Sequence, residues 1–261
     1  MLMLLSPAKS LIEGPAVADL PHSTPVLLEE TERLAKETRG LSTKNLKTLM
    51  GISDKLADLN HQRFQDFEVP LHPDTARQAV RMFNGGVYVG LDAATLSPDD
   101  IAFGQDTVAI LSGFYGVLRP LDLMLPYRLE MGTKLENRRG PNLYAFWGER
   151  IAQTVDGWLA DHDEKVIVNL ASNEYFHAVS GALKSPVITP RFEDVKDGKS
   201  RVVSFFAKAA RGMMVRWALQ HRAERAEELK GFDSGGYTFV PDDSTDTRWV
   251  FRRQQPPPAR R

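Results

Sequence analysis

Polar side chains that could bind a ligand lie in or directly after three apolar runs of this sequence. They are Ser6, Lys9, Ser112, Asn169, Ser172 and Glu174. In α/β proteins, ligands bind at the sheet edge where parallel strands end. If the three runs are neighbouring parallel strands, we expect these side chains to face one shared crevice. Such a crevice suits an anion, above all a phosphate.

Basic residues elsewhere in the sequence can complete this crevice. Lys208 and Arg211 stand three apart on one face of an expected helix, and Arg119 and Arg128 are candidates for the crevice wall. The competing interpretation is that each serine only caps the turn or helix that follows it, as serines commonly do. Glu174 and Lys9 could also form a general acid/base pair, although nothing in the sequence indicates which reaction they would serve.

The familiar signatures of enzymes and metal sites are missing. Lys9-Ser10 lacks the glycines of a phosphate-binding P-loop, and neither G-x-G-x-x-G nor G-x-S-x-G occurs. The six histidines show no paired spacing, so we expect no metal site and no cofactor. The absence of cysteine excludes disulfides, thiolate ligands and a cysteine nucleophile.

A second candidate site is the segment Leu46–Ala57. We expect two short helices, about Thr43–Met50 and Asp54–Phe67, to meet at the turn Gly51-Ile52-Ser53. This pattern resembles the helix–hairpin–helix of DNA-repair proteins, in which backbone amides at the turn and the second helix's N-terminus hold a DNA phosphate. The residues that could contribute are Lys44, Lys47, Gly51, Ile52, Ser53, Lys55 and Arg63.

Two residues of this corner depart from the usual motif. Ser53 replaces its second glycine, and Asp54 places a carboxylate beside the proposed phosphate. A plain helical corner therefore remains the competing interpretation. If the corner does bind DNA, its contacts to phosphates would position a duplex without reading the bases.

The positions of the charges matter more than their sum. The chain of 261 residues has a formal net charge of −1, with 33 basic and 34 acidic residues. Lys199–Lys230 holds eight basic residues and three acids, whereas Asp92–Asp106 holds four acids and no base. A near-neutral chain can thus present a basic cleft and an acidic flank, or it can spread the same charges over solvated helix faces.

The elements expected around these residues indicate a mixed α/β (α+β) fold in a single compact domain of residues 1–253. Buried strands are expected at Leu2–Leu5, Val108–Leu111 and Val166–Leu170, and a hairpin at Val187–Val195 and Ser200–Phe206 around Asp197-Gly198. Further strands are expected at Tyr237–Val240 and Arg248–Arg252, and helices at Thr24–Gly40, Asp74–Phe83, a short segment after Ser97, Asn142–His162 and Lys208–His221.

The two ends of the chain carry little structural information. Residues 254–261 are rich in proline and arginine and are expected to form a disordered tail. No apolar run approaches the roughly 20 residues of a membrane span, and the initial run Met1–Leu5 is too short for a signal peptide. We therefore expect a cytoplasmic protein without a membrane partner.

Taken together, these segments resemble the YaaA family of bacterial peroxide-stress proteins over roughly residues 1–253. The matching stretches are residues 5–9, 52–57, 111–122, 126–132, 169–176 and 207–212. The resemblance implies a fold peculiar to the family, with a helix–hairpin–helix at about residues 43–67. It also implies binding of duplex or branched DNA through a basic cleft, protection against peroxide damage, and an indirect effect on unincorporated iron.

Three hypotheses about function follow. The first is a sequence-tolerant DNA-binding protein that uses the Gly51 corner and a basic cleft. The alternative is an enzyme that acts on a nucleotide or nucleic-acid phosphate in the crevice, because the resemblance supplies no catalytic residues. An iron-sequestering protein is the third, and it predicts bound metal in the purified protein.

Overall fold

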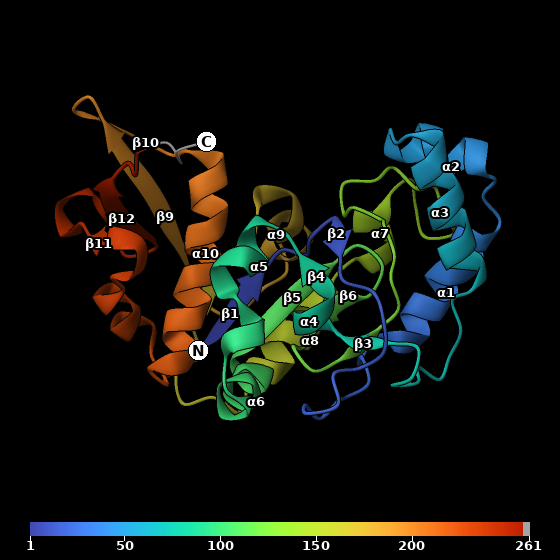
Figure 1. Cartoon of the computed structure of the whole chain (residues 1–261), viewed down its shortest axis with the longest axis horizontal. Coiled ribbons are helices and arrows are strands. Elements are labelled where there is room, and N and C mark those ends of the chain that lie inside the picture. The colour runs from blue at the N-terminus through green and yellow to red at the C-terminus, as the bar shows by residue number, and fades with distance from the viewer. Residues whose placement is uncertain (258–261) are drawn as a thin grey trace.

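A mixed sheet of eight strands runs through the computed structural model, which describes residues 1–257 (Figure 1). Its order is β11-β12-β9-β8-β1-β5-β6, and β10 pairs with β9. The strands are β1 (Leu2–Leu5), β5 (Val108–Ser112), β6 (Gly116–Leu118), β8 (Ile167–Asn169), β9 (Val187–Lys196), β10 (Lys199–Arg201), β11 (Thr238–Phe239) and β12 (Arg248–Gln254). Strands β8, β1 and β5 are parallel neighbours, so their carboxyl ends meet at one edge.

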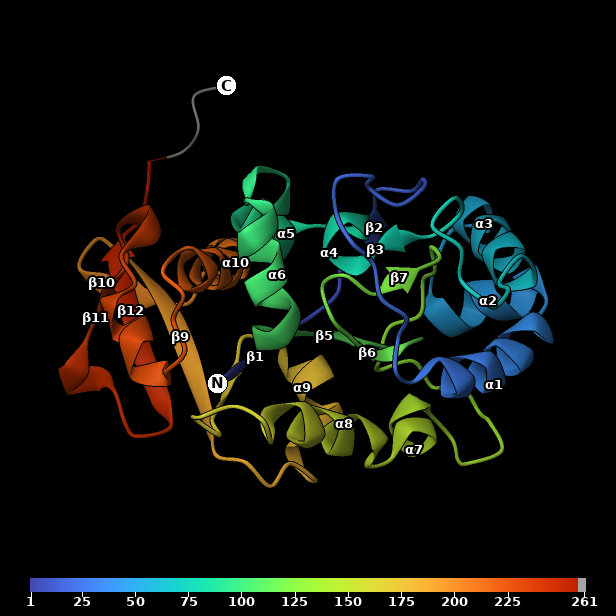
Figure 2. The ribbon, with the colours of Figure 1, turned by 90° about the horizontal axis from the view of Figure 1, so that it is seen from below.

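Helices cover both faces of this sheet (Figure 2). One layer contains α5 (Gly86–Leu91), α6 (Pro98–Thr107) and α10 (Ser204–Gln220). The other contains α7 (Leu143–Trp147), α8 (Arg150–Leu159) and α9 (Asn173–Ser180). Because both faces are covered, the central strands read as continuous apolar runs rather than as alternating patterns.

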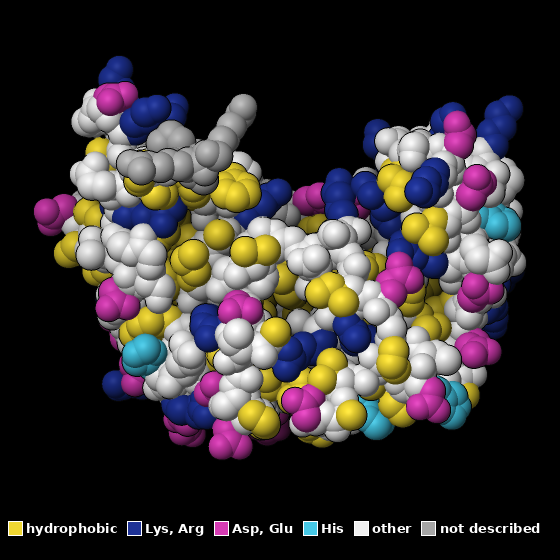
Figure 3. Space-filling view, in the orientation of Figure 1, with side chains coloured by type: hydrophobic (Ala, Val, Ile, Leu, Met, Phe, Trp, Pro, Cys, Tyr) yellow, Lys and Arg dark blue, Asp and Glu magenta, His cyan; other side chains and the backbone are white. Residues whose placement is uncertain are grey.

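Two raised ends flank a hollowed face of the molecule (Figure 3). One end contains the β9–β10 hairpin and α10, and the other contains α1 (Leu28–Arg39), α2 (Thr43–Met50) and α3 (Asp54–Gln65) (Figure 1). Short elements connect the second end to the sheet: β2 (Ser10–Leu11), β3 (Arg77–Gln78), α4 (Ala79–Met82), β4 (Phe83–Asn84) and β7 (Leu123–Met124). 3₁₀ helices lie at Ala93–Thr95, Ala226–Gly231, Ser234–Gly236 and Pro241–Asp243.

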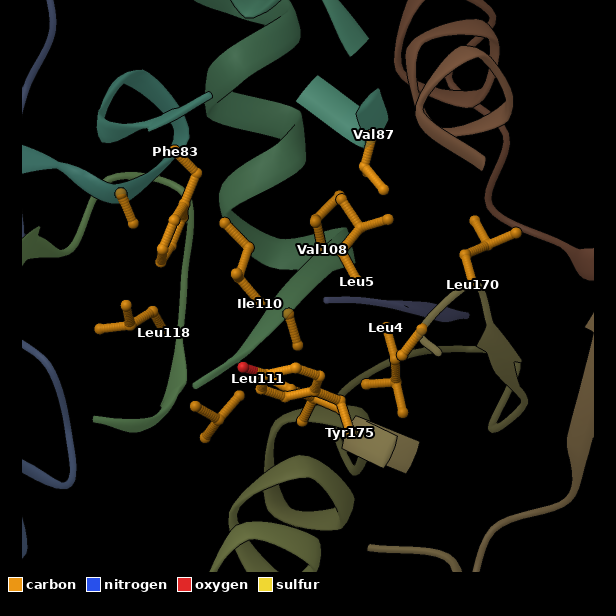
Figure 4. Close-up of a cluster of buried hydrophobic side chains, with 14 of the residues drawn as sticks. Leu4, Leu5, Phe83, Val87, Val108, Ile110, Leu111, Leu118, Leu170 and Tyr175 are labelled. Atoms are coloured by element: carbon orange, nitrogen blue, oxygen red, sulfur yellow. The ribbon is translucent and has the colours of Figure 1, made fainter. Parts of the chain in front are cut away.

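The hydrophobic core lies on both sides of β1 and β5. Figure 4 shows Leu4, Leu5 and Ile110 between the helix layers, with Tyr175 of α9 below them. All four residues of β1 are at most 1% exposed. At about 25 cal/mol per Å² of apolar surface, burial of these strands is a main source of stability. No helix within residues 1–257 has both the length and the hydropathy of a membrane-spanning helix.

The structure confirms the expected fold class and the three buried strands. It also confirms the helix capped by Ser97 and the two helices that meet at Gly51. The hairpin at Asp197-Gly198 is confirmed as well, because both residues adopt the positive φ that a two-residue hairpin turn requires (51° and 72°). Gln254 belongs to β12, so the expected tail begins at least one residue later, and its residues 258–261 lie outside the described part of the chain.

Four expected elements are wrong in their bounds or type. The long helix Asn142–His162 is two helices, because Gly148 adopts φ 51° between them. The expected helix Asp74–Phe83 is a single helical turn, Ala79–Met82, between two short strands. The Thr24–Gly40 helix begins only at Leu28. The second hairpin strand ends at Arg201, because Ser204–Phe206 already belong to α10.

An ionic network on β9 makes part of this fold sensitive to acid. Burial raises the pKa of Glu193, but hydrogen bonds from Ser200, Arg191 and Arg252 outweigh that effect and lower the pKa to about 2. Arg191 and Arg252 lie 2.7 Å from the Glu193 carboxylate. A carboxyl whose pKa is depressed by folding stabilises the native state fully above its unfolded value of 4.5, and that contribution is lost as the pH falls toward 2.

We therefore expect Glu193→Gln to lower the free energy of unfolding by about 2 kcal/mol at pH 7, less than the full shift implies because nearby solvent screens the pair. Urea titrations of variant and wild type at pH 7, 4 and 3 should give a difference that shrinks below pH 4.5. Glu227→Gln, which breaks an exposed pair with Lys230, is the control and should cost less than about 0.5 kcal/mol. A pH-independent difference for Glu193→Gln would contradict this explanation.

Candidate functional site

A cavity of about 490 Å³ opens at the carboxyl ends of β1 and β8. It is lined by the loop after β1 (Ser6–Ser10), the Asn84–Tyr88 turn, residues 127–130, the start of α9 (Ser172, Glu174, Tyr175) and two side chains of α10 (Lys208, Arg211). The structure therefore brings together Ser6, Lys9, Arg128, Ser172, Glu174, Lys208 and Arg211, all of which the sequence suggested for one crevice.

The two strand-end loops are joined by a serine pair. The backbone amide of Ser172 donates to Ser6 Oγ at 2.8 Å, and Ser6 Oγ in turn lies 3.3 Å from Ser172 Oγ. The carbonyl of Ser6 accepts a hydrogen bond of 3.1 Å from the Tyr88 hydroxyl. Ser172 begins α9 without a side-chain cap bond to that helix, so its role differs from the simple capping considered above.

The charges of the cavity fall into paired and unpaired groups. Lys9 Nζ contacts Glu130 at 2.7 Å, and Arg128 lies 3.6 Å from the same carboxylate. Glu174 accepts a hydrogen bond of 2.9 Å from the amide of Gly132. Within residues 1–257, no hydrogen bond joins Lys9 to Glu174, so the acid/base pair considered above is not preformed. Lys208 and Arg211 have no acidic or hydrogen-bond partner among the described residues.

Close contact between α5 and α10 fixes the position of these two cations. A Cβ on Gly212 would lie 1.8 Å from the carbonyl oxygen of Val87, and one on Gly90 would lie 2.0 Å from that of Ala209. Only glycine allows two helix backbones to approach so closely. Lys208 and Arg211 stand on the helix segment that this contact clamps, so their distance from the β1 loop is set by backbone packing.

Three residues suggested for the crevice lie elsewhere. Ser112 is fully buried, and its hydroxyl bonds Tyr127 at 2.6 Å. Asn169 is buried and accepts a bond of 3.0 Å from the Ala171 amide, which shapes the loop before Ser172. Arg119 lies at the opposite edge of the sheet, over the Trp158 ring at 4.6 Å and 3.8 Å from Asp106. The sequence did not reveal that β6 returns the chain to that edge before Arg119.

The second candidate site is the corner between α2 and α3, and its turn is exposed. Gly51 adopts the left-handed conformation (φ 61°, ψ 42°) that ends α2, and a Cβ there would meet no atom within 4 Å. Ile52 is 8% exposed and anchors the turn to the core. Ser53 caps α3 by accepting a bond from the Leu56 amide, and the first amides of a helix have no intrahelical acceptor.

The cations near this corner differ in whether an acidic side chain pairs with them. Lys44 and Lys55 are exposed and have no acidic partner in the described part of the chain, whereas Lys47 pairs with Asp54 at 2.8 Å across the turn. That pair neutralises the carboxylate that stood against phosphate binding. Arg63 is half-buried and is held by Glu13 and Asn60, so it serves the packing of α3.

The basic and acidic stretches of the sequence pair with one another in space. Arg216 contacts Asp92, and Arg222 lies 2.6 Å from Asp100. Arg225 and Lys230 pair with nearby glutamates. Among the residues that the structure describes, the unpaired cations of Lys199–Lys230 are therefore those of its first half: Lys199, Arg201, Lys208 and Arg211. Figure 3 shows Lys and Arg side chains along the hollow and over the α2–α3 end.

Several residues of the cavity were missed by sequence reasoning. Gly85 and Gly86 form a turn whose missing Cβ atoms leave room for Ala8 and Lys208, at 3.0 and 3.2 Å from the positions a Cβ would take. Burial raises the pKa of both Tyr88 and Tyr127, so their hydroxyls stay neutral at the cavity floor. The Gly85-Gly86 pair could have indicated a segment that lines a ligand cavity, but the same pair is also typical of the end of a helix. No group of three metal-ligating side chains was found within residues 1–257.

Comparison with known proteins gives one family. A family model described as peroxide stress protein YaaA matches residues 1–243. A UPF0246 protein of Alteromonas mediterranea is 50% identical over 256 residues, covering 98% of this chain and 99% of the relative. UPF0246 proteins of Dechloromonas aromatica (48% identical, 98% of this chain and 100% of the relative) and Caulobacter vibrioides (50%, 98% and 100%) are similarly close.

Proposed function

The chain belongs to the YaaA family of peroxide stress proteins, and from the geometry of its corner and hollow we propose that it binds duplex or branched DNA without strong sequence preference. The exposed Gly51 turn carries the proposal. It combines a left-handed glycine, free amides at the start of α3 and the exposed cations Lys44 and Lys55. Helix N-termini of this kind bind phosphate through amides and the helix dipole.

The hollow supplies the second half of the proposed surface. Strand β10, which carries Lys199 and Arg201, and helix α10, which carries Lys208, belong to the facing raised end (Figure 1). DNA held at the corner would therefore run past a second group of cations. Backbone contacts alone carry no sequence information, which is why we propose that many sequences are bound alike. DNA held in this way under peroxide stress would be protected, and no step of this proposal requires iron.

The proposal is tested by a charge reversal at the corner. We expect Lys47→Glu combined with Lys55→Glu to weaken binding of duplex, bubble and junction DNA by about tenfold or more near 100 mM salt. The slope of log affinity against log salt should fall by at least about one, because Lys55 is unpaired within residues 1–257 whereas Lys47 is paired with Asp54. Mobility-shift assays over a series of salt concentrations measure both quantities. The fold is checked by circular dichroism.

The matched control reverses two lysines at the opposite sheet edge. Lys165 and Lys184 precede β8 and β9. The double variant Lys165→Glu with Lys184→Glu therefore changes the net charge by the same amount as the corner variant, but at a place far from the corner. We expect this variant to bind DNA within about twofold of the wild type, since surface charges beyond a Debye length are screened. Equal losses in the two variants, or no loss in either with the fold intact, would remove the corner from the mechanism.

A further inference from the structure

Two cations of the cavity, the half-buried Arg211 and the exposed Lys208, have no side-chain partner within residues 1–257. Arg211 is half-buried, and burial lowers the pKa of its guanidinium. Lys208 lies one helical turn earlier. Partial removal of the Arg211 charge from water without pairing it destabilises the folded state. The α5–α10 glycine contact nevertheless holds both cations over the cavity.

A third cation is paired only in part. The Nε atom of Arg128 is buried and has no hydrogen-bond partner in the described residues. Its guanidinium lies 3.6 Å from Glu130, but Lys9 occupies that carboxylate more closely, at 2.7 Å. Buried donors of this kind are normally satisfied, so each unsatisfied one indicates a missing acceptor. An acceptor placed in the cavity would face Arg128, Lys208 and Arg211 together.

The charge balance of the cavity indicates what that acceptor is. Four cations line it against two carboxylates, Glu130 and Glu174, which leaves two positive charges. A phosphate monoester carries close to two negative charges at pH 7, whereas a backbone phosphodiester carries one. The volume of about 490 Å³ lies within the range of small-ligand sites, and the rings of Tyr88, Tyr127 and Tyr175 offer apolar surface beside the cations.

We propose that this cavity binds the phosphate monoester of a nucleotide, supplied either by a free mononucleotide or by the phosphorylated end of a DNA strand. The site depends on residues distinct from the Gly51 corner. Failure of the corner variant to affect DNA binding would leave this proposal standing, and failure of the cavity variants below would leave the corner standing.

The first experiment separates the two sources. Calorimetry compares 2′-deoxyadenosine 5′-monophosphate, its 3′-monophosphate and unphosphorylated 2′-deoxyadenosine, and mobility shifts compare one duplex with phosphate or hydroxyl ends. We expect at least one phosphorylated ligand to bind about tenfold or more tightly than its hydroxyl counterpart, the gain of one charge-assisted hydrogen bond. Preference among mononucleotides identifies a free nucleotide, and preference only among duplexes identifies a strand end. No preference in either series overturns the proposal.

The second experiment uses variants of one helix. Arg211→Gln and Lys208→Gln should each abolish the preference for phosphate. The Tm of the ligand-free protein should stay unchanged or rise for Arg211→Gln, because a half-buried unpaired charge is removed, and should stay unchanged for Lys208→Gln, because Lys208 is exposed. Arg216→Gln is the matched control: Arg216 donates to the carbonyls of Leu91 and Asp92, so its loss should lower Tm and leave the preference intact. If Arg211→Gln and Lys208→Gln keep the preference, the cavity is not the site.

Discussion

Gly212→Ala is expected to lower the free energy of unfolding by about 3 kcal/mol or more, the upper range for overpacking a core. The added Cβ would stand 1.8 Å from the Val87 carbonyl oxygen and 2.6 Å from the Leu91 amide nitrogen. These are backbone atoms of α5, so no rotamer change relieves the contact, and α10 must move away. Alanine's better helix propensity returns only about 1 kcal/mol.

Gly157→Ala on α8 is the matched control for this substitution. Gly157 also lies inside a helix, but a Cβ there meets nothing within 4 Å. We expect this variant to gain about 0.5–1 kcal/mol. Thermal melts should therefore shift in opposite directions, by roughly −6 to −12 °C for Gly212→Ala, given 2–4 °C per kcal/mol for a chain of this size. A Gly212→Ala protein as stable as the wild type would show that α5 and α10 are less closely packed.

The same substitution should also disable the cavity. Lys208 lies one turn before Gly212, and its Cβ lies 3.2 Å from the position a Cβ would take on Gly86. If α10 retreats, both Lys208 and Arg211 leave the cavity, and binding should fall in the fraction that remains folded. The sequence did not identify Gly90 and Gly212 as a contact, because a glycine inside a helix has many possible reasons and the partner helix lies more than a hundred residues away.

The sequence predicted which polar residues follow strands, and one rule of sheet topology predicted that those residues lie together. Ser6, Lys9, Ser172 and Glu174 were placed together because strand ends in parallel sheets share an edge, and β1 and β8 are parallel neighbours. The same rule also suggested Ser112, which is the last residue of the parallel strand β5 but points into the core toward Tyr127. The rule gives the edge on which a residue lies, whereas burial depends on which segment crosses above it.

Long-range pairing of charges was beyond the reach of the sequence. The acidic stretch at residues 92–106 lies against the second half of the basic stretch, as in the pairs Asp92–Arg216 and Asp100–Arg222. A count of charges along the chain therefore overstated the basic surface. Only packing of α6 and α10 against one another decides which cations remain available to a ligand.

The largest loss of DNA affinity should come from combining the corner with the cavity. If one strand with a 5′-phosphate end occupies both sites, the quadruple variant Lys47→Glu, Lys55→Glu, Lys208→Gln and Arg211→Gln should bind it at least about a hundredfold more weakly, since the strand loses the contribution of both sites together. Mobility shifts with the phosphorylated duplex measure the corner pair, the cavity pair and the combination.

The double-mutant cycle also tells one bound strand from two separate ligands. A strand that bridges both sites gains affinity because binding at one site raises its effective concentration at the other. Substitutions at either site should therefore reduce the affinity for the strand by more than they reduce the affinity for a short ligand that binds that site alone. With a hydroxyl-ended duplex, the Lys208→Gln and Arg211→Gln pair should reduce affinity only through the loss of general electrostatic attraction to DNA. The additional loss of affinity that depends on the terminal phosphate should then be absent from the cycle. A cavity pair that weakens both duplexes equally would mean that Lys208 and Arg211 contact the DNA backbone and do not select a monoester, because a diester offers them the same single charge at every position.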